Sequence, residues 1–139
     1  MQATEDDVNQ NNLIVGLTDG VAANLLVSAG AGPKTSGNTL CFYKVDGGLN
    51  WWVYGRDDAD ADVFAIELTA ANSLDKVAHV GSGTAKQRLE IEFLPKNSTQ
   101  ADVIFSIDGV PVYKRTDWLY SGSAKIGRAS CRERVSSPV

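Results

Sequence analysis

The chain has 139 residues, of which 43% are hydrophobic and 22% charged, and its 13 basic and 17 acidic side chains give a formal net charge of −4. This length fits one domain, and this composition is typical of globular proteins rather than disordered or fibrous ones. No apolar run approaches the roughly 18 residues of a membrane span, and the first residues lack the basic and apolar regions of a signal peptide, so we expect neither.

Strand signals separated by turn residues recur along the first half of the chain. An apolar run at residues 12–18 ends at Asp19-Gly20, a pair typical of turns. Residues 40–45 and 49–55 flank Asp46-Gly47-Gly48, and this pattern predicts a hairpin with a short loop.

Two stretches fit strands poorly. Residues 21–29 have the length of two helical turns but precede a glycine-rich run, so a short helix and a structured loop are both open. Residues 69–86 are polar, small and broken by glycine, which indicates a long connection with one weak strand near residues 77–80.

Regular alternation marks two further strands. Residues 63–68 place three apolar side chains on one face. In residues 88–94, Leu89, Ile91 and Phe93 alternate with charged residues, so one face of this strand is expected to face the core and the other water.

The clearest hairpin lies between residues 101 and 118. Asp108-Gly109 separates two alternating runs and predicts a type I′ turn, in which both central residues need positive φ. Pro111 cannot donate a ladder hydrogen bond, so the second strand is expected at an edge or rim. About seven short strands in all predict an all-β fold, an antiparallel β-sandwich or jelly roll.

The last fifteen residues, 125–139, differ from the rest in being basic and without hydrophobic period. Their first part, KIGRASCRERV, resembles the translation of a sequencing adapter; the alternative is a short disordered basic tail that touches nucleic acid. Without this tail 9 basic and 16 acidic residues are left, a net charge of −7, which argues against a nucleic-acid partner. We therefore predict a single domain over residues 1–124 and a non-native tail.

The cysteine and histidine residues of the sequence do not indicate a catalytic site. Without the tail, Cys41 is alone in a strand-like run, so we expect a buried thiol and no disulfide. The one histidine, His79, has no partner that the sequence identifies, and nothing local marks a nucleophile.

An acidic run offers a weak metal candidate. Asp58, Asp60 and Asp62 alternate like the first ligands of a calcium loop, but Val63 and Thr69 stand where an EF-hand has glycine and glutamate. A looser calcium site at the rim and a solvated acidic turn are both open, and our prediction is no metal.

The aromatic segment at residues 49–55 is the best candidate for ligand binding. Neighbouring strand residues face opposite sides, so with Leu49 and Val53 toward the core, Trp52 and Tyr54 are expected to face outward. The further candidates are Asn50, Arg56 and, at the rim, Trp118. Such residues suit stacking on sugars or a protein interface, unless a second sheet or a neighbouring subunit covers them.

These motifs also carry a resemblance. FSIDGVPVYKRTDW after RLEIEFLP resembles the concanavalin A-like lectin and laminin-G-like superfamily. LIVGLTDG and CFYKVDGG with WWVYG are similar to the version found in tailed-phage virion proteins. The resemblance spans residues 13–118 and implies a concanavalin A-like sandwich. Complete domains of this kind are longer, so we expect this one to be incomplete at its ends.

The same family includes enzymes. Laminarinase-type members carry E-x-D-x-x-E, which places a nucleophile and a general acid on one strand face. The matching segment here has Glu90, Glu92 and, in place of the last acid, Pro95. The catalytic pattern is therefore incomplete, and both glutamates are expected on the solvent face.

The resemblance implies a non-enzymatic structural or adhesion domain of a virion or another extracellular surface. Its expected partners are other subunits of that structure, copies of itself, or a glycan, without a cofactor and without membrane contact. The alternatives are a carbohydrate-binding module of a larger extracellular enzyme and a degenerate glycan hydrolase.

Overall fold

The computed structural model describes residues 2–5, 13–18, 26–27, 32–33, 38–45, 48–57, 62–81 and 83–120. The strands in these ranges are β1 (Gln2–Glu5), β2 (Leu13–Thr18), β3 (Leu26–Val27), β4 (Gly32–Pro33), β5 (Thr39–Lys44), β6 (Trp52–Arg56), β7 (Phe64–Glu67), β8 (Gly83–Pro95), β9 (Gln100–Ile107) and β10 (Val110–Leu119). The predicted tail 125–139, the turn at Asp19-Gly20 and the pair Asp46-Gly47 lie outside the described residues. No helix in the described ranges has the length and apolar character that crossing a membrane requires.

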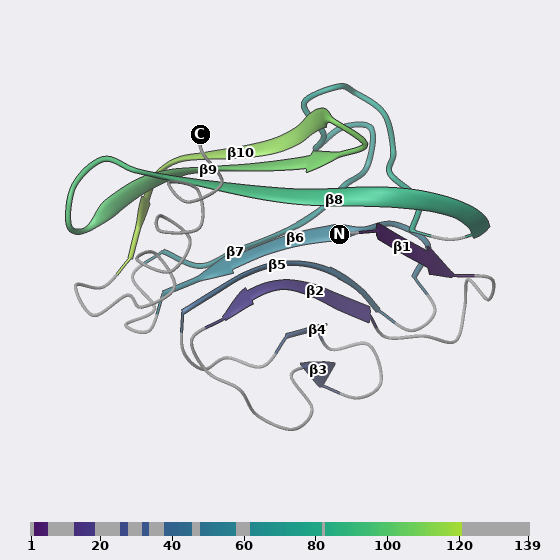
Figure 1. The fold of residues 1–139 in the computed structure, drawn as a ribbon, viewed down its shortest axis with the longest axis horizontal. Helices are drawn as coiled ribbons and strands as arrows, with labels where there is room; N and C mark the ends of the chain where they lie inside the picture. Colours follow the sequence, from purple (N-terminus) through teal and green to yellow (C-terminus); the bar gives the residue numbers. More distant parts are fainter. Residues whose placement is uncertain are drawn as a thin grey trace.

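Two four-stranded sheets face each other and form a β-sandwich (Figure 1). One has the strand order β1-β8-β9-β10 and the other β2-β5-β6-β7, with antiparallel neighbours throughout. The short pair β3–β4 lies on the side of the second sheet that faces away from the first, with β4 against β5 (Figure 1). The predicted all-β sandwich is confirmed, whereas its jelly-roll topology stays a prediction.

The two stretches that fitted strands poorly contain little regular strand among the described residues. Of residues 21–29, the structure describes only the short strand β3. In residues 77–80, the predicted weak strand is reduced to one antiparallel bridge between Val80 and Asn50. The reason is that the backbone of His79 closes on the end of the second sheet, donating to Leu68 and accepting from Trp51.

The hairpin between β9 and β10 has the predicted turn. Asp108 and Gly109 have φ angles of 53° and 81°, the two positive values of a type I′ turn. The side chain of Asp108 also accepts a hydrogen bond from the backbone N–H of Arg88, at 2.8 Å. Pro111 lies on β10, which is an edge strand as predicted.

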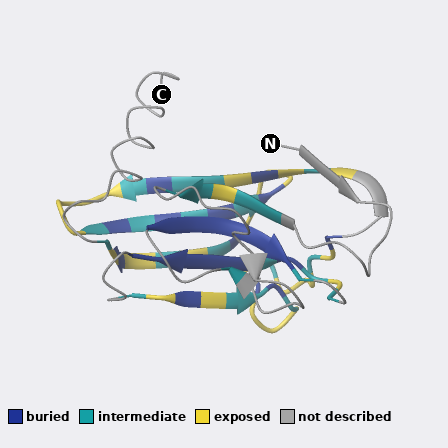
Figure 2. Cartoon of the chain, turned by 90° about the horizontal axis from the view of Figure 1, so that it is seen from below, coloured by how far each residue is buried: buried dark blue, intermediate teal, exposed yellow. Residues whose placement is uncertain are grey.

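The core fills the space between the sheets. Phe105 of β9 meets Phe42 of β5 edge-on, with ring centroids 5.3 Å apart, and Phe64 of β7 at 6.0 Å. Figure 2 shows buried residues gathered in the middle strands of the view, with exposed ones at turns and along the outer strands. The other members of this core are Leu40, Trp51, Val53, Leu68, Leu89, Phe93, Ala101, Val103, Ile107, Val112 and Trp118.

Close packing of an aromatic ring on the backbone explains one glycine of the core. A Cβ atom on Gly55 would lie 2.2 Å from the ring of Phe64, which is its neighbour across the β6–β7 ladder. The missing side chain therefore gives the ring of Phe64 its place inside the sandwich.

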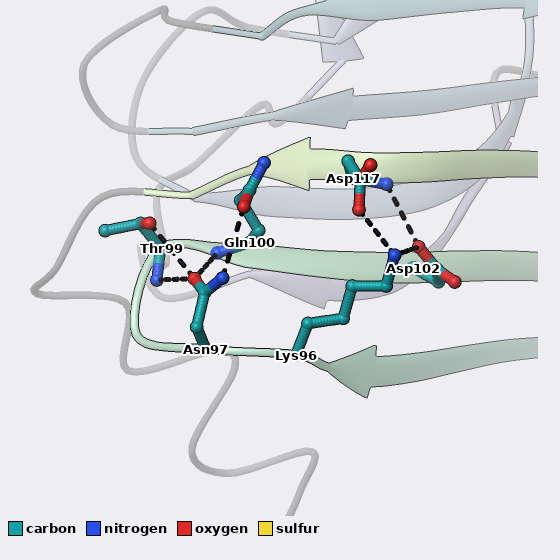
Figure 3. A network of polar contacts seen from close by, with 6 residues as sticks. All are labelled: Lys96, Asn97, Thr99, Gln100, Asp102 and Asp117. Atoms are coloured by element: carbon teal, nitrogen blue, oxygen red, sulfur yellow. Dashed lines mark hydrogen bonds and ion pairs between the residues drawn. The ribbon is translucent and has the colours of Figure 1, made fainter.

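A bulge near the end of β10 is held by a small polar network (Figure 3). Asp117 has a φ of 55°, in the left-handed region, and its backbone N–H donates to Oδ1 of Asp102 at 3.0 Å. Nζ of Lys96 donates to Oδ1 of Asp117 at 2.6 Å and lies 3.4 Å from Oδ1 of Asp102. These contacts fix the path of the chain into Trp118.

The turn between β8 and β9 adjoins this network. Oδ1 of Asn97 accepts hydrogen bonds from the backbone N–H groups of Thr99 and Gln100, at 2.9 and 2.8 Å (Figure 3). The hydroxyl of Tyr120 donates to the carbonyl of Asn97 at 2.6 Å, so the end of β10 is tied to the same turn. One end of the first sheet is therefore a connected polar unit.

Candidate ligand-binding face

The outward side of the sheet β2-β5-β6-β7 carries rows of side chains set by strand register. Ile14, Tyr43, Trp52 and Glu67 lie opposite one another across its four strands. Strand alternation places them all on the face that points away from the sandwich core. We call these four residues the aromatic row, because its two central members are Tyr43 and Trp52.

The centre of the aromatic row is a stacked pair. The rings of Tyr43 and Trp52 have centroids 5.6 Å apart and planes 26° apart, and Tyr54 meets Tyr43 edge-on at 6.1 Å. Burial, followed by the neighbouring Cys41, Tyr54 and Glu67, raises the pKa of Tyr43 far above its ordinary value, so its hydroxyl stays protonated. Tyr43 is therefore an uncharged aromatic support beneath the half-buried Trp52.

Burial divides the face into a covered and an open part. Tyr43 and Tyr54 are 4% exposed and Cys41 only 1%, although all three lie outside the main core. β4 lies against β5 on this side of the sheet. Trp52 is only half-buried and Ala65 is exposed, so the open part lies toward β7.

The predicted outward group is thus only partly accessible. Asn50, Trp52, Tyr54 and Arg56 occupy the outward positions that alternation indicated, but Tyr54 and Arg56 are buried. The prediction that Leu49 faces the core was wrong, because β6 begins only at Trp52 and Leu49 precedes it with half of its surface exposed.

A polar pair borders Trp52 on its open side. Nδ2 of Asn50 donates to Oε2 of Glu67 at 2.8 Å, and both residues are half-buried. The Asn50 carbonyl oxygen and the second Glu67 oxygen have further capacity to accept hydrogen bonds. An indole beside a carboxylate and an amide can bind a molecule that combines an apolar face with several hydroxyl groups.

Trp118 lies elsewhere and inside the protein. Its side chain is fully buried, packs edge-on against Phe93 at 6.3 Å and donates from Nε1 to the backbone carbonyl of Asp62 at 2.9 Å. The ring is therefore not available for stacking on a glycan, which corrects its placement at an open rim. The bulge before it turns the indole into the core.

Asp62 binds within the protein. Its carboxylate accepts hydrogen bonds from the Arg115 guanidinium and from the backbone N–H of Leu119, and its own N–H donates to Asp57. Asp58 and Asp60, the other calcium candidates, lie outside the described residues. Among the residues that are described, no cluster of three metal-ligating side chains occurs.

Two remaining reactive candidates, Glu90 and Cys41, lie in different sheets. Glu90 is exposed and lies 3.2 Å from Arg88, on the solvent side of β8. The thiol of Cys41 is buried, and burial raises its pKa far above the ordinary value, so it is a poor nucleophile.

Three members of the aromatic row, Ile14, Tyr43 and Glu67, were not foreseen from the sequence. The predicted hairpin around residues 46–48 was an imperfect signal for Tyr43, because a loop centred on residue 47 would set Tyr43 opposite Trp51, one residue from its observed partner Trp52. Glu67 had no such signal, since a long segment separates it from Trp52 and only the fold brings β7 beside β6.

In comparisons with known proteins, the chain matches no family model, no curated protein and no solved structure.

Proposed function

We propose that this chain is a non-enzymatic adhesion domain that binds a glycan at the open part of the aromatic row. The observation that carries the proposal is the half-buried Trp52, stacked on Tyr43 and bordered by the hydrogen-bonded pair Asn50 and Glu67. Sugar rings present C–H groups on their faces and hydroxyl groups around their edges. The indole of Trp52 suits the C–H groups of a sugar face, and Asn50 and Glu67 suit its hydroxyl groups.

Preorganisation also supports binding at this place. Tyr43 is buried and holds one side of the indole, so Trp52 gives up little side-chain freedom when a ligand arrives. The exposed Ala65 on β7 leaves space beside the row for a flat ligand that lies along the sheet. This combination favours an extended or multi-ring glycan over a small ion.

The surface context of the proposal is a virion or another extracellular structure, and its support is the sequence resemblance at residues 13–118. A carbohydrate-binding module of a larger extracellular enzyme would use the same aromatic row. The adhesion domain and the enzyme module differ in which further domains or subunits surround them. The position of Glu90 supports a non-enzymatic role, because it lies on the solvent side of β8, in the other sheet.

A glycan array with the chain and three variants tests the proposal. We expect selective binding to a subset of glycans, lost in Trp52→Ala and weakened in Glu67→Gln. Val110→Ala is the matched control, because it truncates an exposed apolar side chain in the other sheet. Absence of selective binding, or binding that Trp52→Ala retains, would refute the proposal.

Enzymatic activity is tested separately. We expect no release of reducing sugar from β-glucans by the chain. Hydrolysis that disappears in Glu90→Gln would instead establish a glycan hydrolase.

A further inference from the structure

β8 is longer than its neighbours, and it is paired differently along its two halves. One edge pairs with β9 from Leu89 to Pro95. The other edge pairs with β1 between Gly83 and Arg88. On this second edge, residues 89–95 have no strand partner within the described ranges. We call this stretch the open edge of β8.

The backbone groups of the open edge are identified by alternation. The carbonyl of Arg88 accepts a hydrogen bond from Asp108 N–H at 2.8 Å, so the N–H and C=O of Arg88 point toward β9. Since successive residues of a strand point to opposite edges, those of Leu89, Ile91 and Phe93 point away from β9. They present a row of donors and acceptors to a further strand.

The open edge is regular, whereas the outer edge of β10 is not. The register between β8 and β9 is unbroken from Leu89 to Pro95. β10 instead has two irregularities, a proline at position 111 and the left-handed Asp117, and its Val112 carbonyl already accepts from Leu74 N–H. β10 thus has several features that protect an edge from pairing, whereas the open edge of β8 has one of them, Pro95, only at its end.

The charges beside the open edge indicate the chemistry of its partner. Glu90 and Glu92 lie on the outward side of β8, while the half-buried Ile91 packs against the core. A second copy in two-fold pairing centred on Ile91 would set Glu90 opposite Glu92, and centred on Glu92 it would set that residue opposite itself. Like charges directly opposite destabilise a pair of strands, so both of these registers disfavour self-pairing.

We propose that the open edge of β8 binds an extended strand of another polypeptide in antiparallel pairing, with apolar residues on one side and lysine or arginine on the other. The apolar side continues the inward row beside Ile91, and the basic side meets Glu90 and Glu92. This assignment rests on the proposed function, because it supplies the subunit contact of an adhesion domain within a larger surface structure.

Two synthetic peptides provide the test. Both are nine residues long, and valine alternates with lysine in one and with glutamate in the other. N-methylation of alternate residues leaves each peptide with a single edge that can form backbone hydrogen bonds. We expect the lysine peptide to bind about tenfold more tightly than the glutamate peptide, as measured by fluorescence anisotropy. Binding should slow amide exchange at Leu89, Ile91 and Phe93.

Charge variants locate the contact. The double variant Glu90→Lys/Glu92→Lys should reverse the preference between the two peptides. Lys114→Glu is the control, because it reverses an exposed charge on β10 in the same sheet, and it should keep the preference for lysine. Equal affinities for both peptides, or amides of Leu89, Ile91 and Phe93 that are already protected in the free protein, would overturn the proposal.

Glycan binding provides an independent readout. The double variant should retain the glycan selectivity of the unchanged chain, whereas Trp52→Ala should retain peptide binding. Peptide binding without any glycan binding would refute the adhesion function and support the open edge as a docking site. Glycan binding without peptide selectivity would refute the open edge alone.

Discussion

Arg115 on β10, an edge strand of one sheet, binds the carboxylate of Asp62, which lies two residues before β7, an edge strand of the other sheet. The guanidinium also lies over the ring of Phe64, 5.3 Å from its centroid. The hydrogen bond with Asp62 raises the pKa of Arg115 above its ordinary value. The two sheets are thus joined at this border by an ion pair and a cation–π contact.

Replacing Arg115 should weaken the sandwich moderately. We expect Arg115→Met to lower the free energy of unfolding by about 1 kcal/mol, because the guanidinium is partly exposed and solvent screens its interactions. Urea denaturation of Arg115→Met, Asp62→Asn and the double variant measures the coupling. Additive effects of the two substitutions would contradict a direct Arg115–Asp62 contribution.

Gly55 should tolerate no side chain while Phe64 keeps its position. We expect Gly55→Ala to destabilise the protein by about 2–3 kcal/mol, because its methyl group would overlap the Phe64 ring. Phe64→Leu provides space, so the variant Gly55→Ala/Phe64→Leu should lose less stability than the sum of the two single variants. Thermal and urea unfolding of all three test this, and additivity would show that the ring is not the obstacle.

The pair Asp75–His79 should make stability depend on pH at the acidic end. Nε2 of His79 lies 2.9 Å from Oδ1 of Asp75, and this hydrogen bond is the main cause that lowers the pKa of Asp75. The pKa of Asp75 is lower in the folded than in the unfolded chain. The ionised Asp75 therefore stabilises the fold at pH values above its ordinary pKa of about 3.8, and this stabilisation is lost as pH falls through the pKa of the folded state.

The pKa of Asp75 can be measured by NMR titration of its carboxyl carbon. His79→Gln should raise the pKa toward its ordinary value, and Asp75→Asn should remove the corresponding part of the acid dependence. An unchanged Asp75 titration in His79→Gln would show that the two side chains do not interact in solution.

The bulge at Asp117 should respond differently to glycine and to a β-branched residue. We expect Asp117→Val to destabilise by about 1–2 kcal/mol more than Asp117→Gly, because only glycine accepts the left-handed φ at low cost. Both variants lose the contact with Lys96, so their difference isolates the backbone. Equal stabilities in urea denaturation would mean that the left-handed conformation is not maintained in solution.

Asp102, at the same bulge, should also make the stability of the protein depend on pH. The hydrogen bond from Asp117 N–H, assisted by Lys96, lowers the pKa of Asp102. Its ionised form therefore stabilises the bulge above the ordinary carboxyl pKa, and the contribution is lost as pH falls through the lowered value. Asp102→Asn should flatten this part of the stability profile, as followed by tryptophan fluorescence in urea at several pH values.

Local patterns predicted most strands and the type I′ turn, because alternation and turn chemistry act over a few residues. Asp108-Gly109 is the clearest case, since both φ values follow from the two residues themselves. The buried position of Trp118 was not predictable in this way. Each bulge in β10 adds one residue to the strand, and the second is held by Asp102 and Lys96, which come from other parts of the chain.

In the candidate site, too, local features were predictable from the sequence and features set by the whole fold were not. Alternation within β6 correctly set Trp52 and Tyr54 on the outward side, because facing is a local property of a strand. Whether an outward side chain is exposed depends on the whole fold. Here Tyr54 is buried, whereas Trp52 is only half-buried. The partners of Trp52 come from β5 and β7, and their arrangement required the complete sheet order.

The aromatic row and the open edge of β8 belong to opposite layers of the sandwich. A domain joined to its neighbours through the edge of one sheet would keep the outward face of the other uncovered. Under the two proposals, one layer of the sandwich would bind the glycan and the other would join the domain to its partner. The two-layer architecture thus keeps the two proposed contacts apart.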